Sequence, residues 1–255
     1  MKKQLLIFGI IGFASIGLLS CESSEAESSG QQDSKPTIEE DSSETIAKEE
    51  SEPVEPFDPA KVDLPEGYAL FDSISGDLNG DGRNDYVFMV KGTDPEEWKE
   101  NQFDEMVDRN RRGLLIYLSE GVQANLAVEN LDCFSSENED GGVYFPPELD
   151  IEIRDGKFYV HYGHGRYGYW TYTFRYQQDK MKLIGYDNNV SRGPITEYEY
   201  SYNFLTGKKL VKKNINVDTE DYEAEEVFTE TWSDLPKKEL ITLSSIEDFD
   251  ELYFD

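Results

Sequence analysis

The chain has 255 residues, 13% of them aromatic, and a formal net charge of −30 from 54 acidic and 24 basic residues. Residues 1–20 carry +2 and residues 21–56 carry −10, which leaves −22 on residues 57–255. A surface of this charge repels phosphate backbones, so the composition argues against nucleic-acid binding and leaves cations, basic proteins and neutral glycans as partners.

The first predicted element is an export signal at residues 1–20. Lys2 and Lys3 precede the apolar run Leu5–Leu19, which is shorter than the roughly 20 residues that a membrane-spanning helix needs. The run ends in Leu-Leu-Ser followed by Cys21. This ending resembles the bacterial lipoprotein signal, and the resemblance implies cleavage before Cys21 and acylation of its thiol. We therefore expect an exported protein that is anchored in a lipid bilayer through Cys21.

Residues 22–56 follow as a segment rich in Glu, Ser and Pro, with few large apolar side chains. Such a composition buries too little apolar surface to offset its ordering entropy, so we expect a disordered acidic linker. Residues 57–255 then form the expected globular domain. Cys133 is the only cysteine besides Cys21. We therefore expect no disulfide in the domain and interpret Cys133 as a small packing residue.

The globular part has the pattern of successive β-strands. Aromatic and aliphatic residues alternate in short runs that Gly, Asn and Asp separate. Asp155-Gly156 predicts a two-residue hairpin turn, and Thr206-Gly207 predicts another tight turn. We expect a mainly β fold, an antiparallel meander of the propeller-blade or sandwich type. The predicted strands are Tyr68–Ser75, Asp85–Lys91, Gly113–Ser119, Ala124–Asn130, Leu149–Arg154, Lys157–Gly163, Tyr169–Gln177, Met181–Asp187, Thr196–Phe204, Lys208–Lys213 and Val227–Trp232.

One segment, Pro95–Arg111, departs from the strand pattern. Its apolar residues Trp98, Phe103 and Met106 recur near helical spacing, and proline is tolerated in the first turn of a helix. The sequence therefore predicts one helix inserted between the second and third strands.

The strongest chemical motif is the loop Asp77–Asp85, which fits the pattern D-x-[DN]-x-D-G-x-x-D. Ca²⁺ takes six to eight oxygen ligands, and alternate side chains of a tight loop can converge on one ion. Gly82 permits the sharp turn that this convergence needs. The alternative is an Asx- and Gly-rich turn without a metal. The predicted calcium ligands are the side chains of Asp77, Asn79, Asp81 and Asp85 and the carbonyl of Arg83.

The loop differs from an EF-hand because Phe88 stands at its twelfth position in place of Glu and predicted strands flank it. GDLNGDGRNDYVFMV at Gly76–Val90, with GLLIYL at Gly113–Leu118, resembles the calcium loop of FG-GAP and VCBS repeats, which joins two strands of a propeller blade. Only one copy is visible in the sequence. Together with YVHYGHGRYGYWTYTFRYQ and NFLTGK, these stretches of residues 68–210 resemble a family of bacterial envelope lipoproteins of uncharacterised function. The resemblance implies a β-rich fold and an envelope location, and it supplies no catalytic residue.

Residues 163–168 fit G-x-G-x-x-G, but a predicted strand follows where a dinucleotide site needs a helix, so we interpret them as a hairpin bend. The two histidines of the chain, His161 and His164, lie here. They could bind Zn²⁺ with nearby carboxylates, although hydrogen bonding or packing is the simpler interpretation. The surrounding aromatic residues could form a platform for sugar rings or for a protein partner. The predicted binding surface consists of His161, His164, Arg166, Tyr167, Tyr169 and Trp170.

Two functions fit these observations. The first is a non-catalytic, membrane-anchored envelope lipoprotein whose calcium-stabilised domain binds or scaffolds an envelope protein or glycan. The alternative is an envelope hydrolase that acts on glycans through carboxylates and the His161/His164 region. An enzyme should place two carboxylates across a cleft, whereas a binding module should show a shallow aromatic face. The acidic stretch Glu137–Gly142 is interpreted as a solvated loop, with a second cation site as the alternative.

Overall fold

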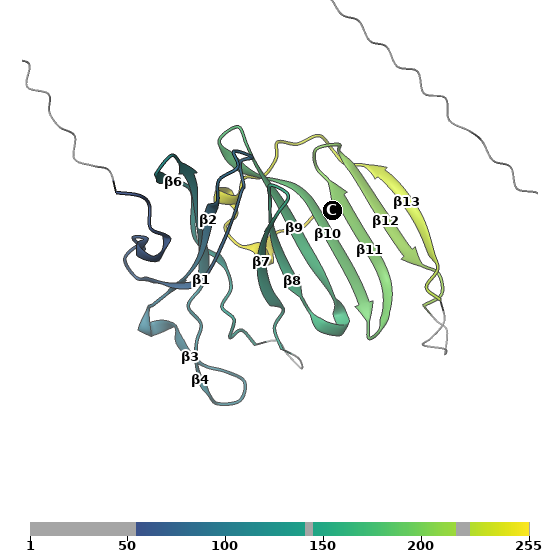
Figure 1. The fold of residues 1–255 in the computed structure, drawn as a ribbon. Coiled ribbons are helices and arrows are strands. Elements are labelled where there is room, and N and C mark those ends of the chain that lie inside the picture. The colour runs from purple at the N-terminus through teal and green to yellow at the C-terminus, as the bar shows by residue number, and fades with distance from the viewer. Residues whose placement is uncertain (1–54, 141–144, 218–224, 255) are drawn as a thin grey trace, which may run out of the picture. The chain divides into compact units, whose positions relative to one another are not determined.

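The computed structural model describes residues 55–140, 145–217 and 225–254 (Figure 1). The predicted export signal, the acylation site Cys21 and the linker up to residue 54 lie outside these ranges. The described part is mainly β, with antiparallel strands and only short 3-10 helices. Within it, no helix has the length and apolar character that a bilayer crossing requires.

The strands form two large antiparallel sheets, and every predicted strand is present. Asp155 and Gly156 both have positive φ, 51° and 65°, which confirms the predicted tight hairpin turn. In spatial order, the four-stranded sheet consists of β1 (Tyr68–Gly76), β2 (Asp85–Gly92), β5 (Arg112–Glu120) and β6 (Gln123–Phe134). The seven-stranded sheet is an uninterrupted meander, in which each strand pairs with the next strand of the chain. Its spatial order is β13 (Phe228–Asp234), β12 (Lys208–Asn214), β11 (Ile195–Asn203), β10 (Lys180–Arg192), β9 (Gly168–Gln177), β8 (Lys157–Gly163) and β7 (Glu148–Arg154).

The predicted helix over Pro95–Arg111 is wrong. The segment forms the 3-10 helix η2 (Pro95–Glu97) and then a hairpin of the short strands β3 (Trp98–Glu100) and β4 (Met106–Asp108). This hairpin stands between β2 and β5 in sequence, where the helix was expected. The remaining 3-10 helices are η1 (Pro59–Lys61), η3 (Gly165–Tyr167), η4 (Leu243–Ser245) and η5 (Phe249–Glu251).

Local hydrogen bonds and the lack of a packing partner explain why this segment is not helical. The Asn101 side chain accepts hydrogen bonds from the backbone N–H groups of Phe103 and Glu105, at 2.9 and 3.0 Å, and these bonds close the hairpin turn. Trp98, Phe103 and Met106 remain 50%, 71% and 58% exposed. Most helices in proteins are stabilised by packing of an apolar face, and here that face has nothing to pack against.

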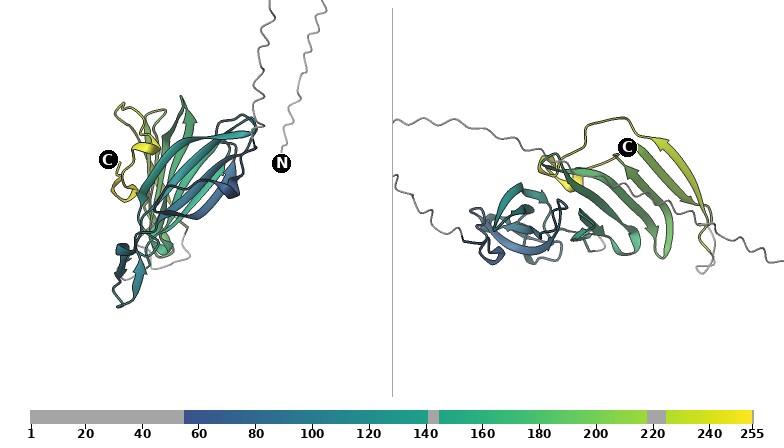
Figure 2. Two further views of the ribbon diagram at one scale, coloured as in Figure 1. Left: turned by 90° about the vertical axis from the view of Figure 1, so that its left-hand side faces the viewer. Right: turned by 45° about the horizontal axis from the view of Figure 1, so that its top comes forward.

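Both large sheets, whose strands Figure 2 shows from two further sides, contribute side chains to one hydrophobic core. Val87 and Ile116 come from the four-stranded sheet, and Phe158 and Phe174 come from the seven-stranded sheet; all four are 0% exposed. Full burial of such a side chain contributes about 1.5–3 kcal/mol. A core shared by two sheets is the packing of a sandwich, whereas one propeller blade is a single sheet.

The two faces of the seven-stranded sheet therefore differ. We name the face that carries Phe158 and Phe174 the inner face, and the opposite, solvent-facing side the outer face. Along β8 the burial alternates residue by residue, as expected for a strand with one covered side. The C-terminal segment also covers part of the inner face, where Phe249 packs edge-on against Tyr172 with ring centroids 5.0 Å apart. The outer face has no such cover among the described residues and is the side that a ligand can reach.

Candidate functional site

The predicted calcium loop forms a tight connection between β1 and β2, which pair in antiparallel register. Gly80 and Gly82 have φ of +80° and +81°, a conformation that other residues rarely adopt. The Asp77 carboxylate accepts three backbone hydrogen bonds, from Gly80 at 2.7 Å, Asp81 at 3.2 Å and Gly82 at 2.9 Å. The loop is therefore wrapped around the Asp77 carboxylate.

Asp81 already has a cationic partner within the loop. The Arg83 guanidinium donates from Nε and Nη2 to Asp81 Oδ2, at 3.2 and 2.9 Å. The backbone N–H of Arg83 donates to Asp81 Oδ1 at 2.9 Å, and this bond is the largest cause that lowers the pKa of the Asp81 carboxyl. Asn79 also donates to Asp81 Oδ2, at 3.3 Å. A metal ion at Asp81 would have to compete with the guanidinium of Arg83.

Asp85 has a structural role that the motif did not reveal. Its side chain is 0% exposed, and its two oxygens accept the backbone N–H groups of Leu78 at 2.8 Å and Ser119 at 2.9 Å. Ser119 belongs to β5, so Asp85 ties the loop to the neighbouring strand. Burial raises the pKa of the Asp85 carboxyl, and the negative charges of Asp81 and Asp77 raise it further.

The predicted ligands fit a calcium site only in part. Among the residues that the structure describes, no three His, Cys, Asp or Glu side chains gather closely enough to hold a metal ion. Asp85 is instead buried, and Asp81 is paired with Arg83. The negative charges of Asp77 and Asp81 nevertheless help to raise the pKa of the Asp85 carboxyl, and a cation near the loop would offset this effect.

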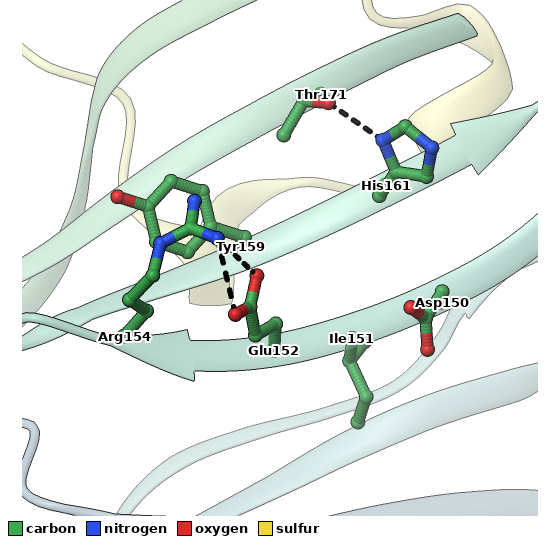
Figure 3. Close-up of a pocket in the computed structure, with 7 residues that line it drawn as sticks. All are labelled: Asp150, Ile151, Glu152, Arg154, Tyr159, His161 and Thr171. Atoms are coloured by element: carbon green, nitrogen blue, oxygen red, sulfur yellow. Dashed lines mark hydrogen bonds and ion pairs between the residues drawn. The ribbon is translucent and has the colours of Figure 1, made fainter.

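A shallow hollow of about 270 Å³ lies on the outer face of β7, β8 and β9, around the predicted binding residue His161 (Figure 3). His161 Nδ1 lies 2.8 Å from Thr171 Oγ1, and this contact orients the ring. Nε2 makes no hydrogen bond with a described residue, which leaves it available to a ligand. The lining residues are Asp150, Ile151, Glu152, Arg154, Tyr159, His161 and Thr171.

The charged groups of the hollow lie along one wall. Arg154 Nη1 contacts both carboxylate oxygens of Glu152, at 3.1 and 3.0 Å, and the guanidinium lies 4.7 Å over the ring of Tyr159. Asp150 faces His161 in the strand register and has no ion pair within the described residues. Asp150 and Glu152 lie on the same side of one strand, two residues apart, so they do not oppose each other across a cleft. That arrangement suits binding better than glycoside cleavage, which uses carboxylates on both sides of the bond.

The structure does not bring the six residues of the predicted binding surface together. Tyr169 points to the outer face, is 44% exposed and has its ring centroid 5.5 Å from that of His161. Trp170 points to the inner face and stacks on the buried Tyr162 at 5.2 Å. Adjacent residues of a strand face opposite sides of a sheet, so a cluster in sequence is divided between two faces.

The other three predicted residues lie in the turn between β8 and β9. His164 and Tyr167 have ring centroids 5.2 Å apart, and the Arg166 guanidinium lies 5.7 Å from the ring of Tyr167. The G-x-G-x-x-G stretch thus joins two strands, as interpreted from the sequence, and no helix follows it. Gly168 has φ of +110°, and a Cβ there would lie 1.8 Å from the carbonyl oxygen of Asn189, so only glycine fits.

Four polar lining residues of the hollow were not expected from the sequence. They belong to no local motif, because residues of the opposite face separate them along their strands. The available signal was the alternation within each predicted strand, which marks these positions as solvent-facing. Which of these residues lie side by side at the hollow depends on the register between the strands. The unexpected polar residues are Asp150, Glu152, Arg154 and Thr171, whereas Tyr159 belongs to the aromatic residues interpreted from the sequence as a binding platform.

The acidic stretch after β6 is held by ion pairs and is not simply solvated. Lys91 Nζ lies 2.5 Å from Glu137 Oε1, and the Lys91 side chain is only 10% exposed. Arg109 pairs with Glu139 at 3.3 Å and with Asp140 at 2.5 Å. These carboxylates are neutralised by cations of the chain itself, which removes the main reason to expect a second metal site. Residues 141 and 142 lie outside the described ranges.

Cys133 offers no nucleophile. It is 0% exposed, and burial raises the pKa of its thiol. Reactive cysteines need a thiolate and access to solvent, so the structure agrees with a packing role.

No protein-family model, curated protein or solved structure matches this chain. The resemblance to FG-GAP and VCBS calcium loops and to envelope lipoproteins therefore rests on the sequence motifs alone. Function is argued below from the geometry of the sites.

Proposed function

We propose that this chain is an exported, membrane-anchored binding protein of the bacterial cell envelope, and that the outer face of its seven-stranded sheet binds a glycan at the hollow around His161. The lipoprotein-like sequence around Cys21 supports export and anchoring. The observation that carries the binding role is the hollow itself. It is shallow and open, most of its lining residues carry polar groups, and it lies on the face of the sheet opposite the core.

The chemistry of the hollow favours a sugar. Carboxylate, imidazole, hydroxyl and guanidinium groups surround it, and a sugar ring presents donors and acceptors on every side. The rings of Tyr159 and Tyr169 offer apolar surfaces on which a sugar ring can stack. Asp150 has no ion pair within the described residues, and residues 57–255 carry −22. The ligand is therefore a neutral or amine-bearing glycan, because an anionic polymer would be repelled.

Calcium binding at the β1–β2 loop is the second part of the proposal. The side chains of Asp77, Asn79 and Asp81 and the carbonyl of Arg83 would supply the ligands, with the Arg83 guanidinium displaced from Asp81. Asp85 would contribute through its charge, which a nearby cation stabilises.

The position of the loop links calcium to the hollow. A Cβ at Gly156, in the β7–β8 turn, would lie 4.0 Å from the Asp77 carbonyl oxygen. A Cβ at Gly76 would lie 2.7 Å from the Ile153 side chain on β7. The loop thus packs against the strand that carries Asp150 and Glu152. A stiffened loop would hold that wall of the hollow in place.

One observation favours the alternative of a glycan hydrolase. The Thr171 hydroxyl lies 2.8 Å from His161 Nδ1, which is the distance between a nucleophile and its base, and Asp150 is the cross-strand neighbour of His161. Glycoside cleavage, however, uses two carboxyl groups that flank the bond, and Asp150 and Glu152 lie on one strand on the same side of Thr171. Release of reducing ends by the wild-type protein, lost in Thr171→Val, would establish this alternative.

Binding is tested with the full-length protein in detergent, titrated with short oligomers of glucosamine and N-acetylglucosamine. His161→Ala should weaken binding about three- to tenfold, because one ligand hydrogen bond contributes about 0.5–1.5 kcal/mol. His164→Ala is the matched control, since His164 lies in the turn and does not line the hollow. Absence of binding to both sugar series, or equal effects of the two variants, would refute the proposed site.

A further inference from the structure

A second hollow, of about 320 Å³, lies on the outer face between β9 and β12. Like the first, it is shallow and lined mostly by residues with polar groups, and no sequence motif marks it. Tyr169 lines this second hollow and also contacts His161 of the first, with ring centroids 5.5 Å apart. The residues that matter below are Tyr169, Asp187, Ser201, Leu210 and Lys212.

The strand register shows that the two hollows lie on one line. One residue on each strand from β7 to β13 can be followed across the sheet, because each is the direct cross-strand partner of the residue on the next strand. Paired residues of an antiparallel sheet point to the same face. We name this line the outer row; it consists of Asp150, His161, Thr171, Asp187, Ser201, Leu210 and Trp232.

The outer row passes through both hollows and ends on an exposed aromatic residue. Its first three residues line the first hollow and the next three line the second. Thr171 and Asp187 are direct neighbours, so no other residue separates the hollows along the row. Trp232, on the edge strand β13, is 63% exposed. Neighbouring strands lie about 4.8 Å apart, so the row spans roughly 29 Å.

We propose that the outer row is one extended binding track for a linear oligosaccharide of neutral or amine-bearing sugars, which crosses the strands and ends by stacking on Trp232. This inference rests on the proposed function and specifies its ligand. Successive side chains along the row would meet successive sugar units. Tyr169, beside the row, and Trp232, at its end, would supply the stacking surfaces.

The charge pattern and the paired backbone separate a glycan from other polymers. Asp150 and Asp187 have no ion pair within the described residues, whereas Glu199 beside the row is paired with Lys212 at 3.2 Å. Two uncompensated carboxylates favour amines and disfavour anionic chains. A peptide that binds as an added strand runs along a sheet edge. The outer row instead crosses the strands, and β8 to β12 are paired with a strand on both sides. These observations favour a hydroxyl-rich chain, a glycan, that the side chains of the row recognise.

Chain-length dependence tests the track in the full-length protein. Hexamers of glucosamine and of N-acetylglucosamine should bind at least about tenfold more tightly than the dimers, because only a long chain fills both hollows. Trp232→Ala should weaken hexamer binding about two- to tenfold, as expected for one aromatic contact, and leave dimer binding unchanged. Trp98→Ala is the matched control, an exposed tryptophan on the β3–β4 hairpin, and should change neither. Asp187→Asn should weaken the glucosamine hexamer more than the acetylated one.

The outcomes distinguish the track from the site on which it rests. Equal affinity for dimer and hexamer, with no effect of Trp232→Ala, would overturn the track, while sensitivity to His161→Ala would still support the first hollow. Failure of every sugar to bind would overturn both. Tighter binding of oligolysine than of the glucosamine hexamer would overturn the glycan assignment and identify a basic peptide as the ligand.

Discussion

Replacing Asp85 with alanine should destabilise the domain by about 2–4 kcal/mol. The carboxylate is 0% exposed and accepts the backbone N–H groups of Leu78 at 2.8 Å and Ser119 at 2.9 Å. Alanine would leave both groups without an acceptor, and each unsatisfied buried group costs about 1–3 kcal/mol. Removal of a buried negative charge offsets part of this loss, because burial and the charges of Asp81 and Asp77 disfavour the ionised form.

Urea and thermal unfolding of the full-length protein in a calcium chelator would measure this loss without a metal contribution. For a domain of this size, a loss of about 3 kcal/mol lowers Tm by roughly 6–12 °C. Asp81→Ala is the control, since it removes a carboxylate of the same loop whose bond to Arg83 is partly exposed, and should cost no more than about 1 kcal/mol. The reasoning fails if Asp85→Ala loses no more stability than Asp81→Ala.

The pH dependence of the free energy of unfolding tests independently whether burial makes the ionised form of Asp85 unfavourable. The pKa of Asp85 is raised above its ordinary value of 3.8, so the folded state holds the proton more tightly than the unfolded state. The free energy of unfolding of the wild type, relative to Asp85→Asn, should therefore fall as the pH rises from 3.8 through the raised pKa. A relative gain in stability over that interval would show that the two N–H bonds outweigh burial.

Three further predictions concern the loop, the core and the anchor. Calcium at a hundredfold excess over Kd should stabilise the protein by about 2.7 kcal/mol, an effect that Asp81→Ala abolishes and Arg83→Gln strengthens; calorimetry without a binding signal would refute the site. Tyr162→Phe should raise the free energy of unfolding by about 1 kcal/mol, because the buried hydroxyl has no hydrogen-bond partner among the described residues; a loss in urea unfolding would contradict this. Cys21→Ser should move the protein from the membrane to the soluble fraction on centrifugation, and unchanged retention would exclude the acyl anchor.

The sequence by itself determined the strands and the tight turns. Short aromatic and aliphatic runs between turn residues place every strand of the two large sheets. These runs alternate with polar residues in strands such as β8 and are continuous in β2 and β5. The turn at Asp155-Gly156 follows equally from local chemistry, since its two positive φ angles suit these residue types. The same local reasoning failed over Pro95–Arg111, where the apolar spacing suggested a helix and no core was available to stabilise one.

Tertiary structure decided what each solvent-facing or buried position does. Asp85 follows the spacing of a metal ligand, yet β5 supplies the Ser119 N–H that binds its carboxylate in the interior. Tyr169 and Trp170 are neighbours in sequence and face opposite sides of the sheet. The alternation within a strand predicts that consecutive side chains point to opposite faces of the sheet. Which of the two faces is exposed to solvent depends on where the second sheet packs. The outer row depends further on the register of six strand pairs, and register is set by contacts between strands that no single stretch of sequence contains.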